Sequence, residues 1–414
     1  MRCSRGEPCV RGRPARPRGR GRLLTRTRTQ VAIVGAGPAG LTLAQLLHRA
    51  GIESVVLEDR SRDYVEQRIR AGVLEQGTVE TLTDAGVGAR MEREGIVHRG
   101  INLQFAGERH HLAFDELTGG GTIVVYGQTE VVKDLIAARL DDGLPLLFEV
   151  DGVAVHDFEG EAPYVTYTHD GEEQRLDCDV IAGCDGFHGV CRPAIERVLT
   201  EFTREYPYGW LGILAEAAPS TEELVYAHHD RGFALLSLRS PTLSRLYVQC
   251  RPDEDLAEWP DERVWEELRL RTALEGWTLN EGPVLEKGVT GMRSFVAEPM
   301  QHGRLYLAGD AAHIVPPTGA KGLNLAIADV TVLAQALEQW YANGDASALA
   351  GYSDRCLRRV WRAEHFSWWM TSMLHRVGDD PFDLKLQLSQ LRYVVTSEAA
   401  ARSLAENYVG LVPG

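Results

Sequence analysis

Three glycines near the start of the chain, Gly35, Gly37 and Gly40, have the G-x-G-x-x-G spacing. A short apolar segment, 30–34, precedes them, and a run of good helix formers, 41–50, follows. Glycines here let the backbone turn sharply and approach a diphosphate, which the first amides of a helix can bind. A second apolar segment, 54–57, ends in Glu58, whose carboxylate suits a ribose hydroxyl. Together they predict a β-α-β unit that binds a dinucleotide.

Two acidic residues far along the chain follow apolar segments in the same way. Asp185 comes after the segment 179–184, and Asp310 comes after 304–308. A segment rich in proline and glycine, 316–324, then opens into a predicted helix that runs to about residue 341. Backbone amides at such a helix start can hold an anion or an electron-rich ring edge. We therefore expect one long cofactor to tie these distant segments into one α/β domain.

The composition is that of an ordinary globular enzyme, with 44% hydrophobic and 25% charged residues in a chain of 414. The net charge of −15 argues against nucleic acid as a partner. No apolar run approaches the roughly 20 residues of a membrane span, so we expect no membrane partner. Seven cysteines without a C-x-x-C pair predict free thiols, no metal site and a cytoplasmic location.

The first 28 residues differ sharply from the rest, because they hold ten arginines and one glutamate. Such an arm buries too little apolar surface to offset its ordering entropy, so we expect it to be disordered. A transit peptide or a nucleic-acid tail would explain the arginines. We favour an upstream start codon translated in error, and expect that removing the arm leaves catalysis unchanged.

Several segments from about Thr29 onward resemble the class A flavoprotein aromatic hydroxylases, and among them the 4-hydroxybenzoate 3-monooxygenases. The matching segments are 68–77, 126–130, 298–303, 309–324 and 366–371. The resemblance implies a single-component FAD enzyme that uses NADH or NADPH and O2. It would hydroxylate 4-hydroxybenzoate to 3,4-dihydroxybenzoate (protocatechuate) through a flavin C4a-hydroperoxide. It also suggests a homodimer.

The resemblance implies a domain organisation around the predicted cofactor. The fold class is α/β, with an FAD-binding three-layer Rossmann-like domain of the glutathione reductase type, an inserted β-rich substrate domain and a helical C-terminal region. The alternating pattern between 205 and 288 favours an antiparallel sheet for the insertion. We expect the FAD domain in 29–95, 124–203 and 290–350, the substrate domain in 96–123 and 204–289, and the helical region in 351–414.

The resemblance also assigns cofactor contacts. The residues implied to bind FAD are Gly35, Gly37, Gly40, Glu58, Arg70, Gln128, Asp185, Arg245, Asp310, Lys321 and Asn324. Those implied for NAD(P)H are Asp59, Arg68, His188 and Arg293. Strictly NADPH-using relatives carry a basic residue in the position of Asp59, where an acid would repel a 2′-phosphate. We therefore favour NADH, or the use of both donors.

The substrate site follows from the same resemblance. Ser237, Arg239 and Tyr247 would bind the substrate carboxylate, and the first two lie on one face of a strand because they are two residues apart. The catalytic residues implied are Tyr226, Tyr408, His98 and Pro317. Tyr226 would take the phenol proton and pass it through Tyr408 and waters to His98, while the Pro317 carbonyl would orient the phenol.

Two other functions stay open at this point. A related hydroxylase could act on a benzoate with another para substituent, such as 4-aminobenzoate, with the carboxylate site unchanged. A non-enzymatic FAD-fold protein is disfavoured because it needs neither an arginine clamp nor a proton relay. We expect His313 to be structural and Trp368, Trp369 and Met370 to pack on a helix face.

Overall fold

The computed structural model describes residues 25–67 and 72–410. A six-stranded sheet lies at the centre of the cofactor region, in the order β19-β20-β13-β2-β3-β9. Its strands are β2 (Val31–Val34), β3 (Ser54–Leu57), β9 (Leu146–Leu147), β13 (Val180–Gly183), β19 (Gln301–His302) and β20 (Leu305–Leu307). All neighbours pair in parallel except β19 and β20. The nearly continuous apolar strands reflect burial on both faces.

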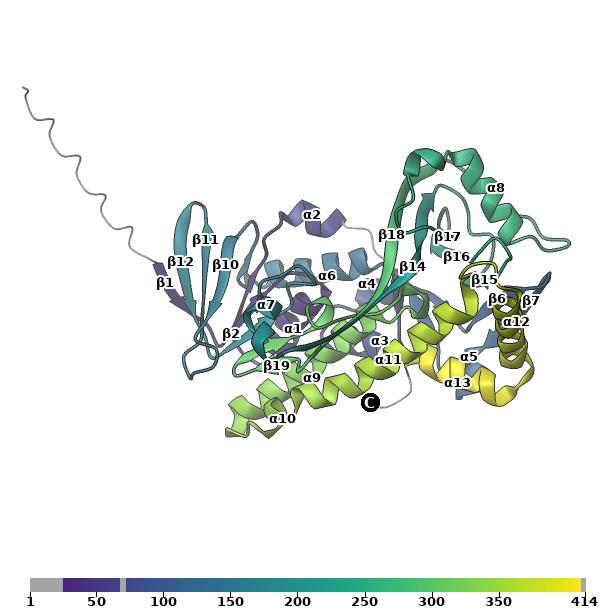
Figure 1. Cartoon of the computed structure of the whole chain (residues 1–414). Helices are drawn as coiled ribbons and strands as arrows, with labels where there is room; N and C mark the ends of the chain where they lie inside the picture. Colours follow the sequence, from purple (N-terminus) through teal and green to yellow (C-terminus); the bar gives the residue numbers. More distant parts are fainter. Residues whose placement is uncertain (1–24, 68–71, 411–414) are drawn as a thin grey trace, which may run out of the picture.

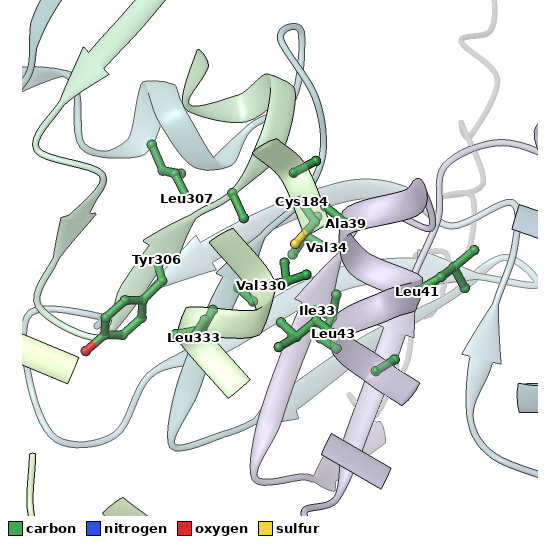
Figure 2. Packing of buried hydrophobic residues seen from close by; sticks show 14 of the residues in the cluster. Ile33, Val34, Ala39, Leu41, Leu43, Cys184, Tyr306, Leu307, Val330 and Leu333 are labelled. Carbon is green, nitrogen blue, oxygen red and sulfur yellow. The ribbon is translucent and has the colours of Figure 1, made fainter. Parts of the chain in front are cut away.

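Helices α1 (Pro38–Arg49) and α9 (Gly322–Asn343) pack together against this sheet. Figure 2 shows side chains from the two helices and from β2 meeting in one core: Ile33, Val34, Leu41, Leu43, Val330 and Leu333. A second sheet, β1-β12-β11-β10, adds another layer (Figure 1). Its last three strands are β10 (Asp151–His156), β11 (Tyr164–His169) and β12 (Glu172–Asp177). The predicted α/β class is confirmed.

The expectation of a disordered arm through residue 28 is wrong for its last four residues. Thr25–Arg28 form β1, which pairs in parallel with β12. Arg26 forms an ion pair with Asp177, and Arg28 approaches Asp179 at 2.5 Å. Backbone pairing and two carboxylates therefore order a segment that its own apolar content would not. Residues 1–24 lie outside the described part of the chain.

An eight-stranded sheet forms the second large layer, in the order β21-β18-β14-β17-β16-β15-β6-β7. Its strands are β6 (Gly100–Phe105), β7 (Glu108–Ala113), β14 (Thr200–Ala215), β15 (Val225–Ala227), β16 (Ala234–Ser240), β17 (Leu243–Cys250), β18 (Val284–Glu298) and β21 (His313–Ile314). The long β14 and β18 connect the two regions in Figure 1, so the expected boundaries at 203/204 and 289/290 fall inside strands. The predicted antiparallel character holds for all pairs but β15 with β6.

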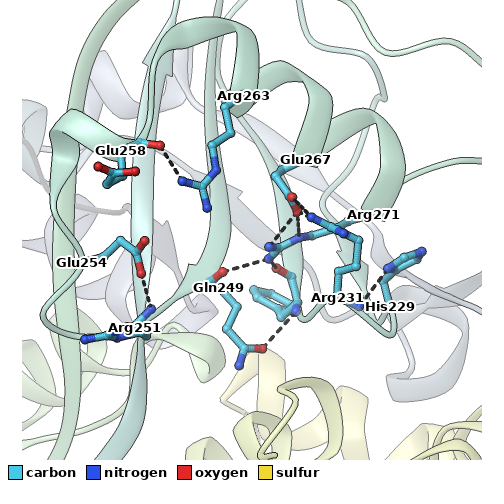
Figure 3. Close-up of polar contacts among 10 residues, drawn as sticks. His229, Arg231, Gln249, Arg251, Glu254, Glu258, Arg263, Glu267 and Arg271 are labelled. Carbon is cyan, nitrogen blue, oxygen red and sulfur yellow. Dashed lines mark hydrogen bonds and ion pairs between the residues drawn. The ribbon is translucent and has the colours of Figure 1, made fainter. Parts of the chain in front are cut away.

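Helix α8 (Asp261–Arg271), which sequence patterns did not predict, covers one face of this sheet. Figure 3 shows its Glu267 lying between Arg231 and Arg271. The other face lies against α11 (Tyr352–Leu374), α12 (Pro381–Thr396) and α13 (Glu398–Val409), which confirms the helical C-terminal region.

The remaining elements are short and connect these layers. A three-stranded sheet contains β4 (Val73–Leu74), β5 (Ile96–His98) and β8 (Ile123–Val125). The other α-helices are α2 (Arg62–Gln67), α3 (Gln76–Asp84), α4 (Ala89–Glu94), α5 (Phe114–Thr118), α6 (Gln128–Asp141), α7 (Cys191–Ala194) and α10 (Ser347–Ala350). Single 3-10 turns occur at Glu196–Val198, Leu256–Glu258, Gly309–Ala311 and Pro317–Gly319.

Candidate active site

The three glycine-containing signatures meet at one edge of the parallel sheet. Gly35 has φ +103°, and a Cβ there would lie 2.3 Å from the carbonyl oxygen of Cys184, next to Asp185. A Cβ on Gly309 would lie 3.4 Å from that of Ala39 in α1. Both later signatures therefore lie next to the first one. Segments that are distant in sequence form a single site, as expected.

The helix starts at this edge have room for a ligand. Gly37 caps α1 and Gly322 is the first residue of α9, and a Cβ on either would meet nothing within 4 Å. By contrast, a Cβ on Gly40 would lie 2.0 Å from the Gly35 carbonyl oxygen. Gly40 thus closes the helix onto the turn, while open space remains beside the first amides. Such amides bind phosphate well.

Three carboxylates surround this space. Glu58 directly follows β3, where it accepts hydrogen bonds from the amides of Ala36 at 2.6 Å and Arg60 at 3.0 Å. Burial raises its pKa, although the Ala36 amide opposes the shift. Asp185 holds its Oδ1 buried without a partner among the described residues, and Asp310 is exposed. Carboxylate oxygens with lone pairs left beside an open phosphate cradle fit the ribose and ribityl hydroxyls of FAD.

Two residues expected to contact the cofactor use their side chains elsewhere. Asn324 accepts from the Glu75 amide at 2.9 Å and donates to the carbonyls of Val73 and Ala320. The Lys321 ammonium donates to Glu75 at 2.6 Å and to the carbonyls of Asn407 and Tyr408. Because an ammonium has three donors, Lys321 has none left. Both side chains therefore hold the surrounding loops in place, and a contact of either residue with the cofactor stays a prediction.

His313 is fully enclosed and paired with Asp329 in α9, at 2.6 Å. The same carboxylate oxygen accepts from the Gly309 amide at 3.0 Å. Burial alone lowers the pKa of His313, but Asp329 raises it above the usual value. The pair therefore fastens the Gly309–Asp310 turn to α9, which agrees with the structural role that we expected.

The side chains expected to bind substrate lie on one face of the eight-stranded sheet. Ser237 pairs with Arg245 across β16 and β17, and Arg239 follows Ser237 by two residues. Leu235 of β16 pairs with both Tyr226 and Tyr247. Opposite and alternate positions in a sheet point to the same side. The register therefore brings together Tyr226, Ser237, Arg245 and Tyr247. It shifts between Leu238 and Ser240, and Arg239 is placed near them by its electrostatic interaction with Tyr247 and Arg245.

Two cations stand among these residues. Burial lowers the pKa of Arg239, and the nearby Tyr247 opposes that shift. The nearest ion-pair partner of Arg245 is Glu286, at 3.8 Å, and its guanidinium lies 5.5 Å from the Tyr247 ring centroid. A partly buried guanidinium beside a hydroxyl and a phenol matches the two oxygens of a carboxylate.

Two buried phenols meet at the inner end of this face. The Tyr226 and Tyr408 hydroxyls are 2.5 Å apart, although the residues are 182 positions apart in the sequence. Tyr226 is 2% exposed and Tyr408 is 1% exposed. Burial raises the pKa of both phenols far above the usual value. Both are therefore neutral hydroxyls, each able to accept one proton and donate another.

His98 lies in β5 on the same side of the molecule as Tyr408. The next residue, Arg99, accepts from the Phe114 amide at 2.6 Å, and the Phe114 ring packs 5.1 Å from that of Tyr408. His98 is fully buried, and neither ring nitrogen has a partner among the described residues. Burial lowers its pKa to about 4, below the value near 6.5 assumed from sequence. His98 is therefore neutral at physiological pH.

Comparison with known proteins assigns the family. The FAD binding domain family matches residues 28–367, which is most of the chain. The chain belongs to this family of FAD-dependent aromatic hydroxylases. It is 49% identical over 387 residues to the p-hydroxybenzoate hydroxylase of Acinetobacter baylyi, covering 93% of this chain and 96% of that one. The protein is therefore a flavoprotein monooxygenase.

Solved structures of other flavin monooxygenases share the fold. The p-nitrophenol 4-monooxygenase PnpA from Pseudomonas putida superposes with a TM-score of 0.79 at 20% identity, covering 93% of this chain and 99% of that one. The anhydrotetracycline hydroxylase OxyS from Streptomyces rimosus gives 0.72 at 23% identity, covering 93% and 76%.

In this hydroxylase, the residues expected to bind the nicotinamide donor form two groups. His188 and Arg293 contact Phe187, whereas Asp59 and Arg68 follow Glu58 in the sequence. His188 is exposed, and its ring lies 5.1 Å from that of Phe187, which the Arg293 guanidinium covers at 4.3 Å. Asp59 is exposed beside Arg60. Arg68 lies outside the described residues, as does Arg70, which we expect to bind FAD. Gln128, also expected to bind FAD, lies next to Gly72, since a Cβ added at Gly72 would be 2.7 Å from the Gln128 amide nitrogen.

Pro317 and Glu75 lie around the loop that leads into α9. Pro317 is exposed, and its carbonyl accepts from the Ala320 amide at 2.9 Å, which leaves one lone pair for a ligand. Sequence analysis missed Glu75, a buried carboxylate that pairs with Lys321 and Arg359. Its position inside the matching segment 68–77 was the available signal.

Neither a metal-binding cluster of side chains nor a membrane-spanning helix occurs in the part of the chain that the structure describes. No group of three or more histidine, cysteine, aspartate or glutamate side chains is arranged there to hold a metal ion. Among the described helices, none is both long and apolar enough to span a bilayer.

Proposed function

We propose that this hydroxylase converts 4-hydroxybenzoate to 3,4-dihydroxybenzoate, using O2 and a nicotinamide donor. One observation carries the proposal: a buried pair of phenols, Tyr226 and Tyr408, ends the sheet face that also presents Ser237 and Arg239. A para-hydroxy acid has a phenol at one end and a carboxylate at the other. The 49% identity to a p-hydroxybenzoate hydroxylase supports the same substrate.

The carboxylate end is bound by Ser237, Arg239 and Tyr247. A guanidinium donates two parallel hydrogen bonds to a carboxylate, and the two hydroxyls satisfy its remaining lone pairs. Arg239 carries its charge in a partly buried position, so this attraction is stronger than it would be in open solvent.

The phenol end is activated by proton removal. Tyr226 accepts the substrate proton while its own proton passes to Tyr408, across the 2.5 Å contact. His98, held neutral by burial, receives a proton through water at one nitrogen and releases one from the other. The substrate then gains phenolate character, and the carbon next to the phenol oxygen becomes more electron-rich. Bound FAD, once reduced, supplies the oxygen atom by reaction with O2.

The expected donor is NADH, or both nicotinamides. Arg60 lies 3.5 Å from Asp59, and Arg62 lies 2.6 Å from Glu66. Among the described residues that follow Glu58, both arginines therefore already face a carboxylate, which leaves less charge for a 2′-phosphate. Anaerobic reduction of the flavin by NADH and by NADPH, with and without 4-hydroxybenzoate, tests this. A kcat/KM for NADPH well above that for NADH would refute it.

We also infer a homodimer through α12. Phe382, Leu386 and Tyr393 are 66%, 54% and 57% exposed, and their spacing puts them on one helix face. Sedimentation of the wild type and of Leu386→Lys tests this face, because a lysine there should favour the monomer. The five described cysteines are free, which suits the cytoplasmic location we propose.

Turnover with a substrate panel tests the proposed function. We expect 4-hydroxybenzoate to accelerate NADH oxidation and to yield one 3,4-dihydroxybenzoate for each NADH. 4-Aminobenzoate is the second candidate substrate, because the carboxylate contacts would be the same. Faster product formation from 4-aminobenzoate would favour that activity, and no stimulation by either acid would refute a benzoate hydroxylase.

A further inference from the structure

A fully buried histidine, His375, follows the end of α11 and faces the substrate sheet. Aromatic rings enclose it: the centroids of Tyr208, Trp210 and Phe233 lie 4.8, 5.9 and 4.5 Å from its own. The proposed chemistry gives this residue no task. Its contacts nevertheless lead directly to the tyrosines of the substrate site.

Hydrogen bonds restrict His375 to one protonation state. Its Nδ1 lies 3.0 Å from the Thr371 carbonyl oxygen, which can only accept, so Nδ1 carries a proton. The Trp210 indole N–H donates to Nε2 at 2.7 Å, so Nε2 offers a lone pair. Only the neutral Nδ1–H tautomer satisfies both contacts. Burial lowers the pKa of His375 to about 3, which keeps the ring neutral at physiological pH.

The Trp210 indole connects His375 to the substrate site. Trp210 packs against Tyr247 with ring centroids 4.8 Å apart and planes inclined by 46°. On the other side, Phe233 lies between His375 and Tyr226, with centroids 4.5 and 6.0 Å away. The His375 ring therefore supports both proposed substrate tyrosines through one intervening aromatic ring each.

The backbone around His375 is itself anchored. The Gln387 amide donates to the His375 carbonyl at 2.6 Å. The Gln249 side chain of β17 accepts from the Arg376 amide at 3.0 Å and donates to the Arg376 carbonyl at 2.7 Å. The backbone that carries the imidazole is therefore held in place, so the imidazole can hold the indole.

We propose that His375 is a positioning residue for substrate binding: its neutral imidazole holds the Trp210 indole at the angle that places the Tyr247 phenol for the carboxylate. This inference rests on the proposed function, because it assigns Tyr247 to the carboxylate. It predicts that His375 and Tyr247 act on substrate affinity as one unit.

A double-mutant cycle tests this coupling. The Kd of 4-hydroxybenzoate, followed by the flavin absorbance change, is measured for the wild type, His375→Leu, Tyr247→Phe and the double variant. Each single change should raise Kd about five- to tenfold, the value of one hydrogen bond. In the double variant, the rise in Kd should be well below the product of the two single rises. His375→Gln, which keeps an acceptor for the indole, should recover most of the affinity.

His228 provides a matched control. It is 5% exposed and bonds the Leu374 carbonyl, and its Nε2 has no partner among the described residues. His228→Asn should show no coupling to Tyr247→Phe. If His375→Leu fails to fold, Trp210→Phe removes the same hydrogen bond from the other side.

The outcomes distinguish a failure of the positioning role from a failure of the proposed function. Full multiplication of the His375 and Tyr247 effects, or an unchanged Kd in His375→Leu, overturns the positioning role alone. Failure of the wild type to bind 4-hydroxybenzoate overturns the proposed function and this inference with it.

Discussion

The two faces of the eight-stranded sheet are built by the same strands but differ in the polar groups that they carry. The face under α8 is apolar, with Leu211, Ile213, Val225, Ala227, Ala234, Leu236, Leu246 and Val248. The opposite face carries Tyr226, Ser237, Arg239, Arg245 and Tyr247. Neighbouring residues in one strand therefore serve different purposes, because the side-chain period is two.

This difference shows how the molecule separates stability from recognition. Apolar side chains under α8 stabilise the sheet by burial, and none of them has a group that could bind an acid. On the other face, the hydroxyls and guanidinium groups add little to stability but define a ligand. Substitutions one residue apart should therefore change different quantities.

Arg239→Ala should have the largest effect on the polar face. Loss of the cation that binds the carboxylate should weaken 4-hydroxybenzoate by about 3 kcal/mol or more, over a hundredfold in Kd. Titration of the flavin absorbance measures Kd, and Arg251→Ala, an exposed arginine, is the control. Arg239→Lys should recover only part of the affinity, and full recovery would argue against paired hydrogen bonds.

Leu246→Ala should produce the opposite result from the apolar face. Leu246 is 3% exposed, so the change should cost about 3 kcal/mol of unfolding free energy through lost burial and a cavity. The Kd of 4-hydroxybenzoate should change less than about threefold, because the side chain points away from the ligand. Urea unfolding measures the loss, with Leu285→Ala, 54% exposed, as the control. A large rise in Kd would show that the face under α8 also determines substrate binding.

His98 is fully buried in β5, and its burial predicts a pH effect on stability. Its pKa is about 4 in the folded state and near 6.5 when unfolded, so the unfolded state binds the proton first as pH falls. Stability should therefore be full above pH 6.5 and fall between 6.5 and 4, by up to roughly 3 kcal/mol. His98→Gln should show a smaller decline in urea unfolding. Equal slopes for both proteins would contradict a buried neutral imidazole.

Tyr226→Phe should separate substrate binding from proton transfer on the polar face. The ring remains, so substrate affinity should change less than about tenfold, one hydrogen bond being lost. Loss of the proton acceptor should slow 3,4-dihydroxybenzoate formation about a hundredfold. Product analysis against NADH consumption measures this, with Tyr167→Phe, another buried tyrosine, as the control. Unchanged product formation would exclude Tyr226 from proton transfer.

The sequence predicts the cofactor region better than the substrate region for a physical reason. Gly35 and Gly40 report local requirements, a positive φ and a close backbone contact, that appear as residue types. The contact of Tyr226 with Tyr408 joins residues 182 positions apart, and only the resemblance to a family could suggest it.

Long-range partners follow the same rule. The sequence does not show that the Lys321 and Asn324 side chains contact Glu75 or its backbone, because Glu75 is about 250 positions away. Likewise, Arg26 and Arg28 were placed in a disordered arm because their partners, Asp177 and Asp179, lie on a distant strand. Composition describes a segment, whereas these contacts depend on the assembled fold.

The central claim is that one sheet face recognises both ends of a para-hydroxy acid. Its most direct test is the binding of three ligands to the FAD-loaded wild type, followed by the flavin absorbance change. 4-Hydroxybenzoate should bind most tightly, and 4-hydroxybenzamide and benzoate, which lack one recognised end each, should bind at least about tenfold more weakly. Equal affinity for all three ligands would contradict the claim.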